Sequence, residues 1–418
     1  MYDLCIIGAG MIGSSAARHA TLFSNNKVCL IGPSEPKERS KGNNRDIYGA
    51  YYDEARITRS CSSDVIWAKL AQKSIRRYKD IENKSGIKFY NEVGNIMAGA
   101  GSNSSFLKSV RSAAIQSNVE TESFDAEMFR KTFPYLKVPD NVQAELETTN
   151  AGFINPRKLV EAEQTLASQQ GCTLIDDVVH KVERIVCSDG TYAMKVVTDS
   201  GICINARKVL LATGAFTSFR QLVPYLKFDF QIIPTLVVLA EVDFSTDAMK
   251  QLRSMPCFIY EGPPHKDWKI MDYDKGRQET SLFMMPPVKY PDDKYYIKAG
   301  ILDPFPVKLI SKEEVKQWYD EGNKVMGEHL MEAVQSMFNG IQFKSWRFDT
   351  CCIMQTPTGH PYIDKVQDQL GIAIGGNGRA AKSCDEIARI AVSMMLYGWT
   401  SDLPQQAFTM RTIHMSKL

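Results

Sequence analysis

Three glycines near the start of the chain have the spacing of a turn that binds the diphosphate of a dinucleotide. Gly8, Gly10 and Gly13 form a G-x-G-x-x-G pattern, in which Ile12 precedes the last glycine. The first glycine would make a tight turn, the second would let the backbone approach the pyrophosphate, and the third would let a helix pack on a strand. The N-terminus of that helix would then face the phosphates. A glycine-rich turn without a ligand is the alternative interpretation.

The segments around these glycines are those that a dinucleotide-binding fold requires. An apolar run at 2–7 predicts a buried parallel strand, small residues at 14–20 predict a helix, and 27–31 predicts a second strand. Strand, glycine turn, helix and strand within about 30 residues form a βαβ unit, so we expect dinucleotide binding. The acidic residue that usually ends the second strand and binds the ribose is absent, and Ser34 or Glu35 is the expected substitute.

Two arginines form a second group of side chains that could do chemistry. Arg56 and Arg59 follow the segment 49–55. An arginine presents a rigid fork of N–H donors, which fits the two oxygens of a carboxylate. The usual position of an arginine is the solvated surface, so the motif alone leaves both interpretations open.

Two lysines lie where a cation needs a partner. Lys298 is within the apolar segment 295–300, so it is either at a sheet edge or beside a charge, because an unpaired buried ammonium is costly. Lys382 follows an apolar segment and a turn that contains Gly376 and Gly378. Such a turn offers backbone N–H groups and the positive end of a helix to a ligand. Lys382 could instead be an ordinary lysine at a helix start.

The ten cysteines do not form a metal or disulfide framework. They are scattered, and no two have the C-x-x-C spacing. We therefore expect no metal site, and a reducing compartment. Cys351 and Cys352 are adjacent, and a pair of buried structural cysteines is the ordinary interpretation for them.

Composition indicates a soluble protein that acts on a small molecule. The chain has 418 residues, 44% of them hydrophobic and 23% charged, and a formal net charge of +2. This balance gives no footprint for nucleic acid, and no apolar stretch reaches the roughly 18 residues of a membrane span. The chain opens directly into an apolar segment with no basic residues before it, so we expect no secretory leader. Its last residues, Ser416-Lys417-Leu418, match a peroxisomal import signal, with a frayed polar tail as the alternative.

The elements that must position these residues alternate along the chain in a way that predicts two domains. The segments 66–81, 157–170 and 385–395 predict helices, and 203–211 predicts a buried strand that ends at a turn containing Gly214. Short β-branched and aromatic runs predict an antiparallel sheet, at 88–99, 228–242, 281–287 and 295–301. The chain is also too long for one ordinary core.

Taken with the glycine turn, the C-terminal third of the chain resembles the amine-oxidising flavoproteins of the D-amino-acid oxidase superfamily. The likeness is greatest to the branch of monomeric sarcosine oxidase, peroxisomal pipecolate oxidase and fructosyl-amino-acid oxidase. It is most specific at 49–59, 295–300, 350–357 and 371–382. The resemblance implies an α/β fold with an α+β insertion, in which a Rossmann-type FAD-binding domain carries an inserted antiparallel-sheet substrate domain. We predict an FAD-binding domain from residues 1–85, 150–220 and 340–418, and a substrate-binding domain from 86–149 and 221–339.

The resemblance also implies a role for each cation. In the family, the residues that match Arg59 and Lys382 hold the substrate carboxylate, and the arginine that matches Arg56 lies close to the flavin. The lysine that matches Lys298 sits over flavin N5 and speeds the reaction of reduced flavin with oxygen. Lys298 and Arg56 are thus the predicted catalytic residues. The predicted FAD contacts are Gly8, Gly10, Ile12, Gly13, Ser34, Gly214, Cys351, Gly376, Gly378 and Lys382.

The segment 350–357 resembles the one whose cysteine carries a covalent 8α-S-cysteinyl bond to FAD. Registration on Thr356, five residues after the linking cysteine in the family pattern, selects Cys351 over Cys352. The chemistry requires a thiolate, which local positive charge favours, and Arg347 is near in sequence.

Two positions depart from the pattern of the sarcosine oxidases. Leu302 stands where they carry a histidine, and Ile353 where they carry a tyrosine. Both changes remove polar contacts, so we predict that Leu302 and Ile353 form a more apolar substrate pocket, suited to a larger or cyclic secondary amine. Asp53 or Glu54 could add a contact for a second amino group.

The resulting hypothesis is an FAD-dependent oxidase of CH–NH donors. It would oxidise the C–N bond of a secondary amine, or of an N-substituted or cyclic amino acid, to an imine, and reduce oxygen to hydrogen peroxide. We expect a monomer that the peroxisomal import receptor carries into peroxisomes. The alternatives are an FAD-dependent amine dehydrogenase that uses another electron acceptor, an oxidase of the D-amino-acid or glycine type with dissociable FAD, and a non-catalytic flavin-binding protein.

Overall fold

The βαβ unit expected at the N-terminus is present in the computed structural model. Strands β1 (Tyr2–Ile7) and β2 (Val28–Ile31) pair in parallel, and α1 (Met11–Leu22) connects them. The structure describes residues 1–23, 26–36, 47–101, 104–220, 222–270, 279–301 and 307–413.

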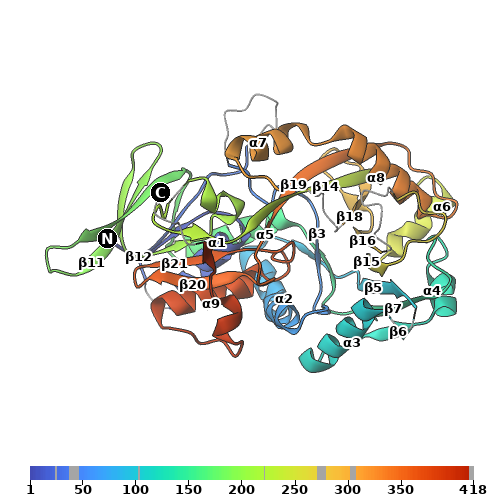
Figure 1. Ribbon diagram of the computed structural model, residues 1–418, viewed down its shortest axis with the longest axis horizontal. Helices are drawn as coiled ribbons and strands as arrows, with labels where there is room; N and C mark the ends of the chain where they lie inside the picture. Colours follow the sequence, from blue (N-terminus) through green and yellow to red (C-terminus); the bar gives the residue numbers. More distant parts are fainter. Residues whose placement is uncertain are drawn as a thin grey trace.

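The parallel strands belong to an eight-stranded sheet at one end of the molecule (Figure 1). Its other strands are β9 (Thr173–Ile175), β10 (Val179–Val186), β11 (Tyr192–Thr198), β12 (Cys203–Leu211), β20 (Tyr362–Gln367) and β21 (Leu370–Ile374). The order is β10-β11-β12-β1-β2-β9, and β21 pairs with β12 and β20. Strands far apart in the sequence thus meet around β1.

Side chains that alternate along β1 are buried on two different faces. Leu4 and Ile6 pack with the helices on one face, whereas Cys5 and Ile7 pack in a separate cluster on the other. The helices on the first face include α1 and also α2 (Val65–Ser85), α5 (Pro156–Gln169) and α9 (Cys384–Leu396). The three helices predicted from the sequence are therefore confirmed.

Local sequence signals explain where these helices begin and end. The Asp64 carboxylate caps α2 by accepting from the N–H of Trp67 at 2.9 Å, and α2 ends at Gly86, whose φ is +73°. Asn155 caps α5, and Pro156 occupies its first turn. No described helix combines the length and apolarity needed to cross a membrane.

A nine-stranded, mostly antiparallel sheet forms the other end of the molecule (Figure 1). Its strands are β5 (Asn95–Ala100), β6 (Glu122–Phe124), β7 (Val142–Glu147), β14 (Gln231–Val242), β15 (Cys257–Gly262), β16 (Thr280–Met284), β17 (Val288–Lys289), β18 (Tyr295–Ile301) and β19 (Trp346–Gln355). The order is β19-β14-β18-β16-β15-β5-β7-β6, and β17 pairs with β18. The predicted combination of a Rossmann-type sheet with an antiparallel sheet is confirmed. Strand β19 comes from the segment 340–418, which we assigned to the FAD-binding domain, and it pairs with β14 in this sheet.

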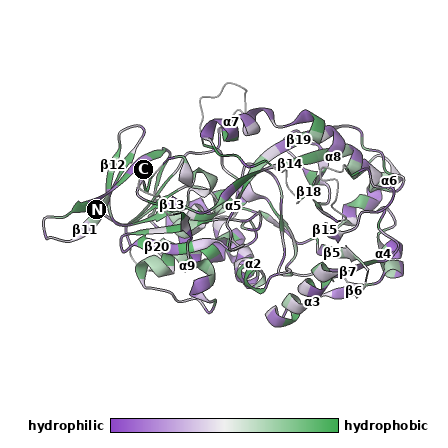
Figure 2. Ribbon diagram, in the orientation of Figure 1, coloured by the Kyte–Doolittle hydropathy of each residue, from purple (hydrophilic) through white to green (hydrophobic). Residues whose placement is uncertain are grey.

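The nine-stranded sheet also has two distinct faces. Ile297 and Ala299 of β18 are buried in the core beneath α8 (Lys324–Ser336), whereas Lys298 between them points to the opposite face. Figure 2 shows that hydrophobic residues follow the strands, while α7 (Lys312–Glu321) is largely hydrophilic. The remaining helices are α3 (Ser105–Ser117), α4 (Ala126–Thr132) and α6 (Asp247–Lys250). Two small sheets join β3 (Arg56–Thr58), β4 (Tyr90–Asn91) and β8 (Gly152–Ile154), and β13 (Lys227–Phe228) with β22 (Thr412–Ile413).

Candidate functional site

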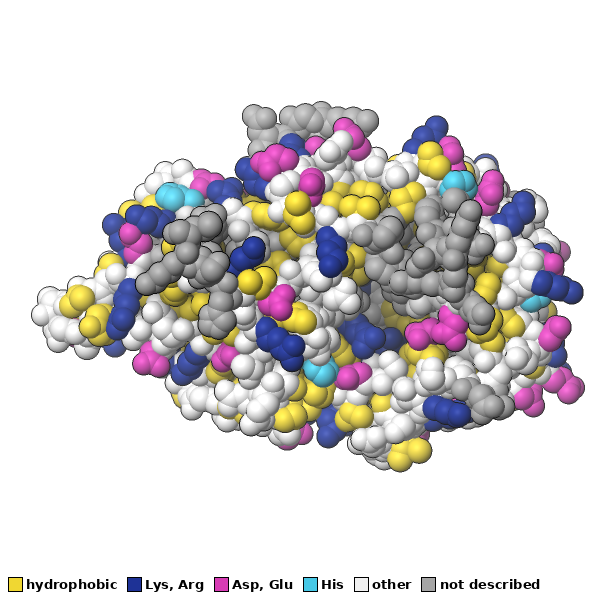
Figure 3. All heavy atoms as spheres, viewed as in Figure 1, with side chains coloured by type: hydrophobic (Ala, Val, Ile, Leu, Met, Phe, Trp, Pro, Cys, Tyr) yellow, Lys and Arg dark blue, Asp and Glu magenta, His cyan; other side chains and the backbone are white. Residues whose placement is uncertain are grey.

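A cavity of about 770 Å³ draws its walls from both large sheets. Near the middle of the face in Figure 3 the surface is hollowed, and basic and acidic side chains gather beside the hollow. Many of the predicted site residues line the cavity: Gly8, Gly10, Ile12, Arg56, Arg59, Gly214, Lys298, Cys351, Ile353, Gly376, Gly378 and Lys382. Gly13 and Ser34 do not line it, and Leu302 lies outside the described residues. Residues from both ends of the chain therefore meet in one site.

The glycine turn after β1 leaves room for a ligand at one of its three glycines. A Cβ on Gly8 would lie 2.4 Å from the carbonyl oxygen of Ala212, and one on Gly13 would lie 1.8 Å from that of Gly8. A Cβ on Gly10 would meet only a ring carbon of Tyr51, at 4.0 Å. In the described part of the chain no side chain caps α1 and no acidic residue lies in its first turn. The positive end of α1 therefore faces the cavity without a counter-charge.

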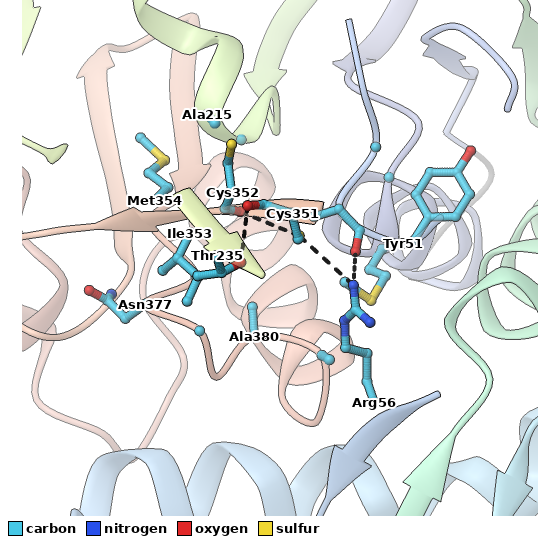
Figure 4. Close-up of a pocket in the computed structure, with 18 of the residues that line it drawn as sticks. Tyr51, Arg56, Ala215, Thr235, Cys351, Cys352, Ile353, Met354, Asn377 and Ala380 are labelled. Atoms are coloured by element: carbon cyan, nitrogen blue, oxygen red, sulfur yellow. Dashed lines mark hydrogen bonds between the residues drawn. The ribbon is translucent and has the colours of Figure 1, made fainter. Parts of the chain in front are cut away.

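A second turn closes the cavity at the end of β21. Gly375, Asn377 and Gly378 have positive φ angles of 87°, 49° and 67°. The side chain of Asn377 accepts from the N–H of Thr356 at 2.9 Å and donates to the carbonyl of Gly375 at 2.7 Å. The turn is thereby tied to the end of β19. Figure 4 shows Asn377 beside Ile353, which lies 3.1 Å from the place a Cβ of Gly378 would occupy.

Lys298 is held in a buried cluster of polar side chains. Its ammonium donates to the carboxylate of Asp53 and, at 2.9 Å, to the carbonyl of Ala55. Asp53 also pairs with Arg56 and accepts from the hydroxyl of Tyr290 at 3.0 Å. Strand β18 lies inside its sheet, so Lys298 is not an edge-strand lysine. Burial, together with the positive charge of Arg56, lowers the pKa of Lys298 well below its usual value. We call Asp53, Arg56, Tyr290 and Lys298 the Asp53 cluster.

Arg59 and Lys382 form no ion pair with any residue that the structure describes. They are 9% and 3% exposed, and neither Nε of Arg59 nor Nζ of Lys382 has a hydrogen-bond partner among the described residues. Arg59 donates through Nη1 to the carbonyl of Cys61. Burial lowers the pKa of Arg59 to about 10, and burial together with the charge of Arg59 lowers that of Lys382 well below its usual value. Two buried cations without an anion are costly, so this open cation pair fits a negatively charged ligand.

Comparison with known proteins identifies the family of the chain. Residues 3–394 match the family described as FAD dependent oxidoreductase. This protein belongs to that family. An FAD dependent oxidoreductase needs a site for a diphosphate and a flavin, and the ligand-accepting space at Gly10 and the anion-seeking end of α1 fit the diphosphate.

Two relatives of the chain are named as a sarcosine oxidase and an N-methyl-L-tryptophan oxidase. The chain is 28% identical over 222 residues to the monomeric sarcosine oxidase of Streptomyces avermitilis, which covers 48% of this chain and 55% of that protein. It is 28% identical over 229 residues to the N-methyl-L-tryptophan oxidase of Yersinia pestis, and this match covers 53% of this chain and 58% of that protein. The matches thus span little more than half the length of these relatives.

Solved structures share the fold at lower identity. NikD, an amino acid oxidase of nikkomycin biosynthesis, aligns with 100% of this chain and 99% of its own, at a TM-score of 0.71 and 15% identity. Amadoriase I from Aspergillus fumigatus aligns with 97% of this chain and 89% of its own, at a TM-score of 0.63 and 17% identity. These similarities concern the fold alone.

The two adjacent cysteines of this FAD dependent oxidoreductase have different surroundings. Cys351 Sγ lies 3.8 Å from Nη2 of Arg56, as the dashed line in Figure 4 shows. Cys352 packs in an apolar cluster, and burial raises the pKa of its thiol. The expectation that Arg347 supplies charge to Cys351 is wrong, because Arg347 pairs with Asp292 at 2.8 Å. Four residues of strand separate it from Cys351, a distance of about 13 Å.

The expected substitutes for the ribose-binding acid have protein partners. Ser34 donates through its N–H and hydroxyl to the carboxylate of Asp176, at 2.8 and 2.6 Å. Glu35 accepts two hydrogen bonds from Arg157, each of 2.7 Å, and Arg157 also donates to Glu54 at 2.6 Å. A ribose contact at Ser34 or Glu35 stays a prediction. Glu54 is already neutralised by Arg157, which disfavours it as a contact for a second amino group.

Glu147 is a buried carboxylate beside the open cation pair that the sequence analysis missed. It is 2% exposed and accepts from the N–H groups of Ser60 and Cys61, at 3.0 and 2.8 Å. Burial raises its pKa to about 7, although the charge of Arg59 opposes the shift. Glu147 therefore fixes the backbone next to Arg59. No local signal could have found it, because its partners are 86 and 87 residues away.

Buried charges behind α1 join the four helices of the eight-stranded sheet. Arg18 donates to Glu163 and Asp385, and Arg77 donates to Asp385 and, at 2.6 Å, to Glu386. Arg18 is 4% exposed and the three carboxylates are fully buried. The network holds α1, and hence the glycine turn at its start, against α2, α5 and α9.

Proposed function

We propose that this protein oxidises the C–N bond of a secondary amine, or of an N-substituted or cyclic amino acid, to an imine, with FAD as the cofactor and oxygen as the electron acceptor. The observation that supports this proposal is the open cation pair, which lines the same cavity as the glycine turn. A substrate carboxylate would supply the anion that Arg59 and Lys382 lack. The relatives are named for the oxidation of sarcosine and of N-methyl-L-tryptophan.

In this proposal the side chains mainly position the substrate. Bound FAD supplies the acceptor for a hydride equivalent. Arg59 and Lys382 hold the carboxylate so that the carbon next to the amine faces the flavin, and such orientation can provide several kcal/mol of the barrier reduction. Ile353 lines the same cavity as the apolar side chains Met97 and Ile259, and these side chains would exclude water from the reacting bond. The amine reacts in its neutral form, and the imine hydrolyses after release.

Anaerobic flavin reduction tests the proposal. Purified protein is expected to be yellow, and its flavin absorbance should bleach when a suitable amine is added without oxygen. We would compare pipecolate, proline, N-methyl amino acids, fructosyl amino acids and sarcosine, and expect sarcosine to be a poorer substrate than the larger amines because of Ile353. A protein that takes up no flavin, or a bound flavin that no amine reduces, would contradict the proposal.

The Asp53 cluster supports a second candidate function. The carboxylate of Asp53 offsets the positive charge of Lys298, and that charge is what the oxidase proposal uses to speed the reaction with oxygen. An amine dehydrogenase with another electron acceptor would need no free cation there. The yield of hydrogen peroxide separates the two, since an oxidase forms one peroxide for each amine oxidised, whereas a dehydrogenase reduces an added dye and forms little peroxide.

We also propose that Cys351 carries FAD covalently. The guanidinium of Arg56 lies 3.8 Å from the Cys351 sulfur, whereas Cys352 packs in an apolar cluster. Acid-precipitated protein should retain flavin fluorescence in the native chain and in Cys352→Ser. Cys351→Ser should release its flavin to the supernatant, and retention there would contradict the proposal.

Peroxisomal location and a monomeric state complete the proposal. The signal Ser416-Lys417-Leu418 lies outside the described residues, so its support is its sequence. A fluorescent protein fused to the N-terminus should mark peroxisomes, and removal of the three residues should leave the fusion in the cytosol. Sedimentation of the purified protein should give a mass near 47.0 kDa.

A further inference from the structure

The cavity face of the nine-stranded sheet changes character along its strands. In an antiparallel sheet, residues opposite one another form rows, and successive rows on one face are about 6.8 Å apart. Lys298 lies in one of these rows. The next row is made of Met97, Ile259, Phe283 and Gly300. The row after that contains Gly99, Glu261 and Ser281. This face of the sheet therefore changes from cationic at Lys298, through an apolar row, to acidic at Glu261.

The side chains of the apolar row cannot form hydrogen bonds with a ligand. Met97 and Ile259 pack with Phe106 of α3 in a buried cluster, and Phe283 lies against it. A Cβ on Gly300 would lie 2.7 Å from the ring of Phe283, so the glycine lets the ring cover the strand. Only an alkyl or other apolar section of a ligand suits this part of the cavity.

Glu261 and Glu279 line the acidic end, and neither forms an ion pair with a described residue. Neither carboxylate has a hydrogen bond or ion pair within the described residues, and Arg379, which also lines the cavity, pairs with neither. Burial and the charge of Glu279 raise the pKa of Glu261, while Arg379 opposes the shift. Glu261 is partly buried and Glu279 is exposed. Two carboxylates that repel one another would be relieved by a positive charge between them.

A ligand in this cavity is indicated by an independent observation. The Nζ of Lys382 is buried, has no partner among the described residues, and lines the same cavity. Asp53 and Glu54 cannot serve a cationic ligand, because Lys298 and Arg56 neutralise the first and Arg157 the second. Asp177 and Asp349 also line the cavity, and they accept hydrogen bonds from Val178 and Ser200 and from Thr350, respectively. Glu261 is thus a partly buried carboxylate of the cavity that has no hydrogen-bond or ion-pair partner among the described residues.

We infer that the cavity takes a substrate that carries a second, cationic group on its tail, an ammonium or a guanidinium, and that Glu261 binds this group. The inference deepens the proposed function and rests on it for the position of the reacting amine. Glu261 lies two strands and two rows from Lys298, a separation on the order of 15 Å. The substrate is therefore an extended amino acid or amine with an alkyl spacer between its reacting end and its charged tail.

Binding measured without turnover tests the inference. Calorimetry of the flavin-loaded protein would compare ω-amino acids of five to eight carbons with fatty acids of the same length. Both series offer a carboxylate to the open cation pair, and only the first offers a distal ammonium. At one chain length or more, the amino acid should bind at least tenfold more tightly than its partner, which is about 1.4 kcal/mol. In Glu261→Gln that ratio should fall to about one, and in the matched control Glu127→Gln, an exposed position on α4, it should stay as in the native chain.

Two results would overturn the inference: equal binding of both series by the native protein, or a preference for the ω-amino acids that Glu261→Gln leaves intact. Kinetics of flavin reduction with Nα-methyl-lysine and Nα-methyl-norleucine then separate this inference from the proposed function. Reduction by both at equal efficiency would sink the inference alone. Reduction by neither, with tight binding of ω-amino acids, would sink the proposed oxidation and leave the cationic-tail site in place.

Discussion

The two cation groups of the cavity differ in what completes them. In the Asp53 cluster, a carboxylate of the protein contacts both Arg56 and Lys298. Beside the open cation pair, the carboxylate of Glu147 binds backbone N–H groups, and neither Arg59 nor Lys382 has an ion pair with a described residue. The first group is complete in the protein alone, and the second becomes complete when a ligand binds. Residue type alone would have made the two groups look alike.

Replacement of Asp53 should have the largest effect on stability, because it removes the anion that contacts both Arg56 and Lys298. Asp53→Asn leaves the buried Lys298 beside the partly exposed Arg56 without their shared anion, which should lower the free energy of unfolding by about 3–5 kcal/mol. Denaturant unfolding of the flavin-free protein measures this loss. The neighbouring Glu54→Gln is the matched control, and it should cost less, because its partner Arg157 is partly exposed.

A second variant keeps this prediction testable if Asp53→Asn does not fold. Asp53→Asn combined with Lys298→Met removes one of the two cations and should recover much of the lost stability. If Asp53→Asn were as stable as the native chain, the description of the cluster as a complete ion group would be incorrect.

Glu147 should have the next largest effect, and it should depend on pH. Its pKa is raised from 4.5 to about 7, so between those values the folded protein holds a proton that the unfolded chain has released. The contribution of Glu147 to stability is therefore present below about pH 4.5 and is lost as pH rises toward 7, by at most about 3 kcal/mol. Unfolding of the native chain and of Glu147→Gln between pH 4.5 and 7.5 should show a smaller decline in the variant. Parallel curves would contradict the assignment.

Replacement of Lys382 by an apolar side chain should have two smaller effects, which are a gain in stability and a loss of substrate binding. Lys382→Met removes a buried cation that has no partner, so the ligand-free protein should become more stable. The same change should weaken carboxylate-bearing substrates by about 2 kcal/mol, roughly 30-fold in kcat/KM. An amine without a carboxylate serves as the control and should lose little. Loss of stability together with unchanged kcat/KM would show that Lys382 is structural.

Local patterns were enough to predict the elements and much of the site. The strand at 2–7, its glycine turn and the helices at 66–81, 157–170 and 385–395 each carry a period or a cap that depends only on nearby residues. Lys298 in an apolar strand predicted either a position at a sheet edge or a nearby charge, because an unpaired buried ammonium is costly. The sequence could not say which carboxylate supplies it, since Asp53 lies 245 residues away.

Long-range pairing explains what the sequence did not reveal. Tertiary contacts place Cys351 beside Arg56 of β3 and Arg347 beside Asp292. Nearness in sequence had favoured Arg347, but a strand is extended, so four residues along it separate the two side chains by about 13 Å. Glu147 and Glu261 were missed for the same reason.

The buried network behind α1 has a consequence for how the protein is made. Arg18 belongs to the first helix, and its two carboxylate partners are Glu163 and Asp385. A nascent chain on the ribosome exposes Arg18 early, but more than 360 residues of further synthesis separate it from Asp385. Glu163 can hold the helix that presents the glycine turn earlier, but the second anchor of Arg18 exists only after the chain reaches Asp385. We therefore expect the cofactor site to be completed late in synthesis.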